Sequence, residues 1–159
     1  TMKNIETVIP ELVSKALELH NRYSHTCIQR TCYCAIFSQS GSEFDHFHTQ
    51  AALLGYPADE TQTGPIYIIP EISTITGPVR VVKIRRPDPE RPERGDADFV
   101  VPDYDIFKNE VLSKKQYRLI EREQHEMIEL YDPAFDVRTY YSNPPIDTLP
   151  KIQKSIGNP

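Results

Sequence analysis

The chain has 159 residues, of which 38% are hydrophobic and 26% charged, and its formal net charge is −5. This length and composition are typical of one globular domain that buries a core without disulfides or structural metals. The acidic balance disfavours nucleic-acid binding, which usually relies on an excess of Lys and Arg. No apolar run approaches the roughly 20 residues that span a bilayer, and residues 2–6 lack the apolar region of a signal peptide. We therefore expect a cytoplasmic protein that binds neither nucleic acid nor membranes.

The N-terminal segment, to about Tyr23, is predicted to be an amphipathic helix. Its apolar residues recur at intervals of three and four, as on one face of a helix: Ile5, Val8, Ile9, Leu12, Val13, Ala16, Leu17 and Leu19. Pro10 lies inside this pattern, and because proline is tolerated in the first turn of a helix, a start near Pro10 is the alternative. We assign residues 2–43 to an N-terminal helical extension.

Three cysteines, Cys27, Cys32 and Cys34, are crowded into eight positions. An odd number at this spacing argues against a disulfide framework and predicts reduced thiols. With His25 they provide four soft ligands, but the spacing is not that of a zinc motif. The alternative interpretation is a buried strand over residues 31–37, in which cysteine acts as a small apolar side chain.

The most distinctive stretch is Asp45-His46-Phe47-His48-Thr49-Gln50. A loop-like segment, residues 38–42, precedes it, so we predict a strand over residues 44–50. Residues two apart on a strand share a face, and His46 and His48 would then point the same way. Two imidazoles on one face suit a metal ion. The alternative is a pair of partly exposed histidines that are hydrogen-bonded to neighbours.

Residues 51–57 are expected to form at most a short helix, and two β-rich runs follow at residues 64–72 and 79–86. Glu71 lies in the first run, where it either faces solvent or is a buried acid with a partner. Residues 85–95 are rich in proline and mixed charge, which predicts an extended linker between two halves. Its arginines could hold a carboxylate or phosphate, but neighbouring acids nearly balance them, so we interpret the linker as self-neutralised.

The second half has a clearer pattern. It predicts a strand at residues 96–102, a helix at 104–112 capped by Asp103, strands at 117–121 and 126–131, and a last strand at 136–142. The charged hairpin between the middle two strands is interpreted as a solvated face, with His125 at its turn. Residues 143–159 carry four prolines and are predicted to be extended or disordered.

Two stretches of this half resemble a known family: Gly95-Asp-Ala-Asp-Phe-Val-Val, and Glu129-Leu-Tyr-Asp-Pro-Ala-Phe-Asp-Val-Arg-Thr-Tyr-Tyr. They resemble the second βαβββ module of the vicinal oxygen chelate superfamily, which includes glyoxalase I and the extradiol dioxygenases. The order of Asp45-His46, the strand at residues 81–84, the Pro-rich loop and Asp96 is most similar to the YecM-like branch, whose members are described as metal-binding. The resemblance covers residues 44–142, which we take as the paired-module domain.

This resemblance implies an α+β fold in which two βαβββ-like modules, the first with a reduced helix, form a curved mixed sheet around a cleft. It also implies a divalent metal, Zn, Mn, Ni or Fe, held by the first and last strands of each module. By position, the ligands fall at His46 or His48, near Lys83, at Asp96 or Asp98, and near Thr139. A protonated lysine is no ligand, and the family often has Glu at the position of Thr139.

A neighbouring glutamate could complete the ligand set, as in a mixed site of histidine and carboxylates. We therefore predict His46, Asp96 and Glu129 as metal ligands, with His48 and Glu71 as proton-transfer groups. The tyrosines at positions 131, 140 and 141 suit the lining of a ligand pocket.

The leading functional prediction is a metal-binding enzyme of the lyase, isomerase or dioxygenase type, acting on a small molecule. The alternative is a non-catalytic small-molecule-binding protein with the same fold and a degenerate metal site. A third hypothesis is an interaction module that pairs through exposed strand edges. A homodimer is compatible with all three.

Overall fold

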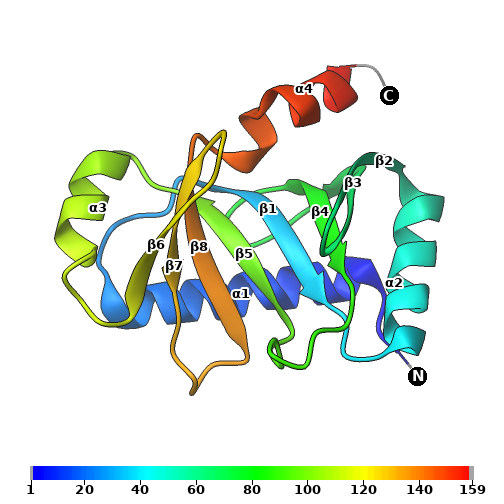
Figure 1. The fold of residues 1–159 in the computed structure, drawn as a ribbon, viewed down its shortest axis with the longest axis horizontal. Coiled ribbons are helices and arrows are strands. Elements are labelled where there is room, and N and C mark those ends of the chain that lie inside the picture. The colour runs from blue at the N-terminus through cyan, green and yellow to red at the C-terminus, as the bar shows by residue number, and fades with distance from the viewer. Residues whose placement is uncertain (1, 158–159) are drawn as a thin grey trace.

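The computed structural model describes residues 2–157 and has two layers (Figure 1), with the first three helices against one face of a mixed eight-stranded sheet and a cleft, bordered by the C-terminal helix, on the other. This is the predicted α+β class with an N-terminal helix. The elements in chain order are α1 Ile5–Tyr23, β1 Arg30–Phe37, α2 Gly41–Leu54, β2 Tyr56–Thr61, β3 Gly64–Ile72, β4 Val79–Arg85, β5 Gly95–Val100, α3 Tyr104–Val111, β6 Tyr117–Glu121, β7 Glu126–Leu130, β8 Val137–Asn143, a 3-10 turn Ile146–Thr148, and α4 Pro150–Gly157.

The order of these elements gives two βαβββ modules, β1-α2-β2-β3-β4 and β5-α3-β6-β7-β8. In the sheet the strands are arranged β2-β3-β4-β1-β5-β8-β7-β6. The first strands of the two modules, β1 and β5, are antiparallel neighbours at the centre, and each pairs in parallel with the last strand of its own module, β4 or β8. The sheet does not close, so β2 and β6 form its two edges.

The first module begins one element earlier than the sequence pattern predicts. Residues 44–50 lie in α2, so the prediction of a strand there is wrong. The helix is favoured by a cap, because the Ser40 hydroxyl accepts a hydrogen bond from the Glu43 backbone N–H at 3.1 Å. Phe47 and Ala51, four residues apart, bury the inner face of the helix.

Strand β1, which lies within the proposed N-terminal extension of residues 2–43, pairs with β4 and β5 at the centre of the sheet. Its sequence Thr-Cys-Tyr-Cys-Ala-Ile-Phe is the buried strand given above as the alternative to a zinc motif. Cys27, Cys32 and Cys34 are free thiols, and the last two are buried. Burial raises the pKa of both thiols well above the ordinary value.

The second module matches the prediction closely. Asp103 caps α3 by accepting a hydrogen bond from the Ile106 N–H at 3.1 Å, and β6, β7 and β8 fall at the predicted places. The tail differs from the prediction, since residues 146–157 form the 3-10 turn and α4 and pack against the sheet. Residues 158–159 lie outside the described part of the chain.

The main core lies between the sheet and the helices. Helix α1 crosses β1, β5 and β8 and buries Ile5, Ile9, Val13, Ala16 and Leu19 completely. Alternate residues of the central strands, such as Cys34, Ala97 and Phe99, point into this core, so their neighbours point to the opposite face. Within residues 2–157, the structure has no helix with the length and apolar character needed to cross a bilayer.

Candidate functional site

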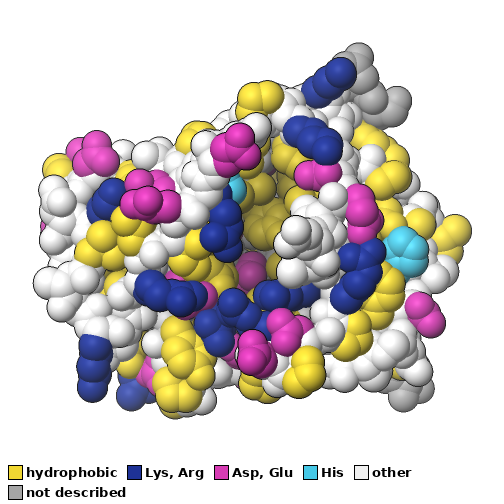
Figure 2. Space-filling model, in the orientation of Figure 1, with side chains coloured by type: hydrophobic (Ala, Val, Ile, Leu, Met, Phe, Trp, Pro, Cys, Tyr) yellow, Lys and Arg dark blue, Asp and Glu magenta, His cyan; other side chains and the backbone are white. Residues whose placement is uncertain are grey.

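A large cleft lies on the face of the sheet that α1 and α2 leave uncovered. Figure 2 shows it as a hollow, with Lys and Arg side chains along its lower rim and hydrophobic side chains on its floor. The cavity measures about 1080 Å³ and is lined by residues of both modules, of the β6–β7 hairpin and of α4. This volume is at the upper end of the range for sites that hold small organic molecules.

One row of paired residues crosses the floor of the cleft. Lys83 on β4 is paired with Ala35 on β1, which is paired with Asp96 on β5, which is paired with Arg138 on β8. Paired residues of neighbouring strands point to the same face of a sheet. Because Ala35 has a single-carbon side chain, no bulky group separates Lys83 from Asp96 in this row.

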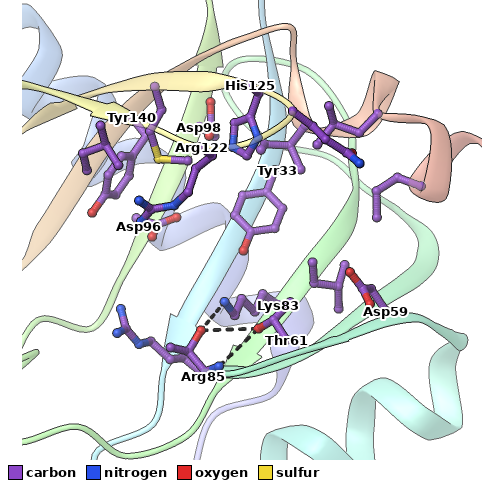
Figure 3. A pocket seen from close by; sticks show the side chains of 18 of the residues that line it. Tyr33, Asp59, Thr61, Lys83, Arg85, Asp96, Asp98, Arg122, His125 and Tyr140 are labelled. Carbon is purple, nitrogen blue, oxygen red and sulfur yellow. Dashed lines mark hydrogen bonds between the residues drawn. The ribbon is translucent and has the colours of Figure 1, made fainter.

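The next row along the strands places Tyr33, Asp98 and Tyr140 side by side on the same face. All three line the cavity, and Figure 3 shows Tyr33 between Lys83 and the hairpin residue His125. Burial raises the pKa of Tyr33 well above its usual range, and the charges of Asp96 and Asp98 add to this. The Tyr33 hydroxyl is therefore neutral at physiological pH.

Asp96 is a buried acid that lacks a full set of partners. It is 7% exposed, and among the described residues its Oδ1 atom has no hydrogen-bond partner. Burial raises the pKa of Asp96 to about 8, and the charge of Asp98 contributes in the same direction. The positive charges of Lys83, Arg85 and Arg91 act in the opposite direction.

Asp98 is equally buried but is well hydrogen-bonded. Its carboxylate accepts hydrogen bonds from the Ser142 backbone N–H at 3.0 Å and from the Ser142 hydroxyl at 2.5 Å. Burial raises the pKa of Asp98 to about 7, while the bonds from Ser142 and the Cys32 thiol limit the rise. Asp98 thus has a structural role in joining β5 to β8, whereas the Oδ1 atom of Asp96 is buried without a partner among the described residues.

Lys83 is the cation at the centre of the floor. Its ammonium group donates a hydrogen bond to the Thr63 hydroxyl (Figure 3), and among the described residues it forms no ion pair within 4.0 Å. Burial lowers the pKa of Lys83 to about 8, and the positive charges of Arg85 and Arg122 also lower it. Asp96 and Asp59 partly compensate.

The cleft is basic although the chain as a whole is acidic. Its lining includes six Lys and Arg residues, namely Lys83, Arg85, Arg91, Arg118, Arg122 and Lys151, and three acids, Asp59, Asp96 and Asp98. The positive residues come from β4, the linker, the β6–β7 hairpin and α4. Arg85 pairs with Asp88 at 3.3 Å, as expected for a self-neutralised linker, whereas Arg91 lies 3.7 Å from Glu129 on β7, and both arginines line the cavity.

One wall of the cleft is apolar. Ile66 on β3 and Ile152 on α4 belong to a second hydrophobic cluster, with Ile68, Val81 and Leu149. The tail is fastened over this cluster by the Arg30–Asp147 pair, with N–O distances of 2.5 and 2.9 Å, and by the Lys151–Asp59 pair at 2.6 Å.

The two histidines of the predicted site lie on α2, which flanks the sheet at the end far from α3 (Figure 1), and neither lines the cavity. His46 Nε2 lies 2.9 Å from the Lys3 carbonyl oxygen, and His48 Nδ1 lies 2.7 Å from the Tyr67 hydroxyl. Tyr67 points into the core on the helix-covered face. His46 and His48 do not share a face as predicted, because residues two apart on a helix point to different sides.

The two glutamates of the prediction are also outside the cavity lining. Glu129 is 4% exposed and is enclosed by Arg138, Arg118 and Tyr140, whose nearest atoms lie at 3.2, 3.2 and 2.6 Å. Burial raises its pKa, but these partners outweigh burial and leave the pKa below the ordinary value. Glu71 is exposed near the end of β3.

Of the three predicted metal ligands, Asp96 alone lines the cleft. Among residues 2–157, no group of three His, Cys, Asp or Glu side chains is arranged to hold a metal ion. In the first module the cleft-facing residues of the first and last strands are Tyr33, Ala35, Lys83 and Arg85, and the one cleft carboxylate of this module, Asp59 on β2, is paired with Lys151. This donor set does not fit a divalent cation, since hard cations require several oxygen ligands and no adjacent ammonium.

Sequence reasoning did not identify Tyr33 and Arg122 as cleft residues, and it placed Lys83 in the cleft through the resemblance, at a ligand position that a protonated lysine cannot fill. The signal for Lys83 was present, because Val-Arg-Val-Val-Lys-Ile-Arg on a central strand places Lys83 and Arg85 on one face. No local sequence pattern marks Arg122 as a cleft residue. It reaches the cleft because the β6–β7 hairpin extends over it (Figure 3).

Comparison with known proteins adds information on the fold. No protein-family model and no curated protein matches the chain. A solved structure described as "Structural Genomics, Protein EC4020" is similar, with a TM-score of 0.58 and 11% sequence identity over 89% of this chain and 92% of that one. At this identity the likeness shows a shared fold and nothing more specific.

Proposed function

We propose that this chain is a small-molecule-binding protein whose cleft holds an organic ligand between its two modules. The observation that carries the proposal is the cavity of about 1080 Å³ over the buried ionisable residues Asp96 and Lys83. Burying such groups is costly unless they are fully paired, and groups with strongly shifted pKa values cluster at functional sites. The Asp96 Oδ1 atom is buried and lacks a hydrogen-bond partner among the described residues, so the carboxyl group is not fully paired within the protein.

The cleft is a better candidate for binding than for metal-dependent chemistry. A lyase, isomerase or dioxygenase of the resembled superfamily needs a divalent metal, and of His46, Asp96 and Glu129 just one faces the cavity. The metal-dependent activity therefore stays a prediction of the resemblance, and it would require a different set of ligands.

The test is a thermal-shift screen of small organic molecules with wild-type protein and a cleft-filling variant. Met127 lines the cavity, so Met127→Trp is expected to occupy part of it. Exposed Glu123, at the end of the same hairpin, gives the control Glu123→Trp. Compounds that bind in the cleft raise the Tm of wild type and Glu123→Trp but not of Met127→Trp. Equal shifts in all three proteins would place the ligands elsewhere and refute the proposal.

The same screen tests the metal prediction. Zn²⁺, Mn²⁺, Ni²⁺ and Fe²⁺ are added to protein purified without a histidine tag, and bound metal is measured. Stoichiometric metal that is lost in His46→Ala, Asp96→Ala and Glu129→Ala would support the predicted ligand set. The structure leads us to expect that His46→Ala has no effect on metal content, since its imidazole bonds to the Lys3 carbonyl and does not line the cavity.

A further inference from the structure

We infer, on the basis of the proposed function, that the ligand is an organic anion whose carboxylate or phosphate lies between Lys83 and Arg122 and whose apolar body lies against the wall formed by α4. Both cations line the cavity, Lys83 from its floor and Arg122 from the hairpin above it (Figure 3). They belong to different modules, so an anion between them would bridge the two halves of the fold.

The first argument is the imbalance of charge in the cleft. Six Lys and Arg residues and three acids line the cavity, in a chain whose formal net charge is −5. Four of the six have a carboxylate within 4.0 Å: Lys151 pairs with Asp59, Arg118 and Arg91 with Glu129, and Arg85 with Asp88. Neither Lys83 nor Arg122 has a carboxylate within 4.0 Å among the residues described.

The second argument is the mutual repulsion of the remaining cations. Arg85 and Arg122 both act on Lys83 in the direction that disfavours its charged form, whereas Asp96, with a larger effect than Arg85, and Asp59 favour it. Like charges gathered at one site are unfavourable for folding, and an anion between them removes the repulsion. A neutral ligand would leave it in place.

The third argument comes from donors that lack acceptors. Within the described part of the chain, Arg85 Nε and Arg91 Nη1 are buried and have no hydrogen-bond partner. The nearest acid to Arg91 Nη1 is Glu129, at 3.7 Å, which is too long for a hydrogen bond. Guanidinium groups with free donors are suited to planar or tetrahedral oxyanions.

The fourth argument concerns the rest of the ligand. Ile66, Leu149 and Ile152 line the same cavity from the side opposite the linker and form an apolar wall. Tyr33 packs against this second cluster and lines the cavity next to Lys83 (Figure 3), where it presents a ring with a polar tip. A molecule with an anionic head and an apolar body would contact both the basic residues and the apolar wall of the cavity, whereas inorganic phosphate would contact the basic residues alone.

The experiment uses full-length protein and four probes that separate the charge from the apolar body: naphthoate, naphthyl phosphate, naphthol and inorganic phosphate. Affinities are measured by titration calorimetry at low and high ionic strength. The variants are Lys83→Met and Arg122→Gln, which remove a cleft charge. The matched control is Arg86→Gln, because Arg86 pairs with Glu60 and does not line the cavity.

Naphthoate or naphthyl phosphate is expected to bind at least tenfold more tightly than naphthol, and the preference between the two identifies the anionic group. Each cleft variant should weaken that binding by about tenfold while the control leaves it unchanged, since a charge-assisted contact is lost. Added salt should weaken the binding of the two aromatic anions and leave the binding of naphthol unchanged.

Three results would overturn the inference. Equal affinity for naphthol and the anions means that the cleft binds organic molecules without selecting charge, which leaves the proposed function standing. Equal weakening by Arg86→Gln means that the effect is the overall charge of the protein. Absence of binding by all four probes at millimolar concentration contradicts both the inference and the proposed function.

Discussion

Lys83 and Asp96 flank Ala35 from opposite sides in one row of the central sheet, and both point into the cleft. Their pKa values are displaced in opposite directions to about the same value, that of Lys83 downward and that of Asp96 upward, each to about 8. Burial is the largest cause for both residues, so the mutual attraction of the pair does not offset the loss of solvent. This arrangement makes stability depend on pH in a specific way.

Asp96→Asn should reduce the loss of stability between about pH 5 and about pH 8. The folded protein holds the Asp96 proton up to about pH 8, whereas the unfolded chain releases it near 3.8, so the free energy of unfolding falls as pH rises through this interval. Asparagine has no such proton, and we expect the variant to be more stable than wild type by ~1 kcal/mol or more at pH 8. Urea denaturation at the two pH values measures the difference.

Other titratable groups near Asp96 limit the pH range in which its contribution to stability can be measured. Asp98 contributes in the same direction up to about pH 7, so part of the slope remains in the variant. Lys83 contributes in the opposite direction above about pH 8, because the folded protein loses that proton before the unfolded chain does. Exposed Asp136→Asn serves as the control, and a wild-type slope in Asp96→Asn would contradict the assignment.

Glu129→Ala should destabilise the protein by ~3 kcal/mol, because it removes the shared acceptor of a buried ionic cluster. Glu129 accepts hydrogen bonds from Tyr140 and Arg138 and pairs with Arg118. Arg138 would keep Glu93 as a partner, which limits the loss. Chemical denaturation measures the effect, with exposed Glu123→Ala as the control, expected within about 0.5 kcal/mol of wild type. A similar result for both variants would mean that the cluster adds no stability.

The second module could be predicted from the sequence because its signals are local. Asp103 caps a helix, and alternating apolar residues mark β6 and β7, so pattern and structure agree. In the first module the sequence carries two conflicting local signals, one for a helix start and one for a strand. Ser40 and Glu43 have the spacing of a helix start, and the Glu43 carboxylate accepts a hydrogen bond from the Gln39 N–H at 3.1 Å. The alternation of His46 and His48 around Phe47 suggested a strand instead.

The site was predictable where it depends on strand alternation and not where it depends on tertiary structure. Asp96 and Asp98 follow from their place on a first strand, and both line the cleft. The prediction of Glu129 as a ligand did not anticipate Arg138 and Arg118, which come from neighbouring strands and occupy its carboxylate. The position of Arg122 depends on where the hairpin ends in space, which no periodicity encodes.

Gly64→Ala should destabilise the protein more than Gly77→Ala, although both glycines have positive φ angles. Gly64 has φ +150°, and a Cβ there would lie 2.1 Å from the Ile84 carbonyl oxygen on β4. Gly77 has φ +100°, and a Cβ there would meet nothing within 4 Å. The loss of stability in Gly77→Ala is therefore expected to come from backbone strain alone, of about 1–3 kcal/mol. Gly64→Ala adds a clash with a backbone atom, and equal losses in thermal denaturation would contradict the close approach of β3 to β4.

Ile152→Ala should lower the free energy of unfolding by ~2 kcal/mol, because it leaves a cavity where α4 packs on the sheet. Ile152 is 4% exposed and belongs to the cluster with Ile66 and Val81. Leu53→Ala is the control, since Leu53 is 83% exposed and its loss should cost little. Hydrogen exchange should also increase in β3 and β4, which α4 covers.

The same variant relates the tail to ligand binding. Because Ile152 lines the cavity, its truncation should weaken an anion with an apolar body severalfold and leave inorganic phosphate unaffected. Calorimetric titration with naphthoate and phosphate separates the two effects, provided that both are measured below the Tm of the variant. Parallel weakening of both ligands would show that α4 acts by holding the cleft in shape through Arg30–Asp147 and Lys151–Asp59, and that Ile152 does not touch the ligand.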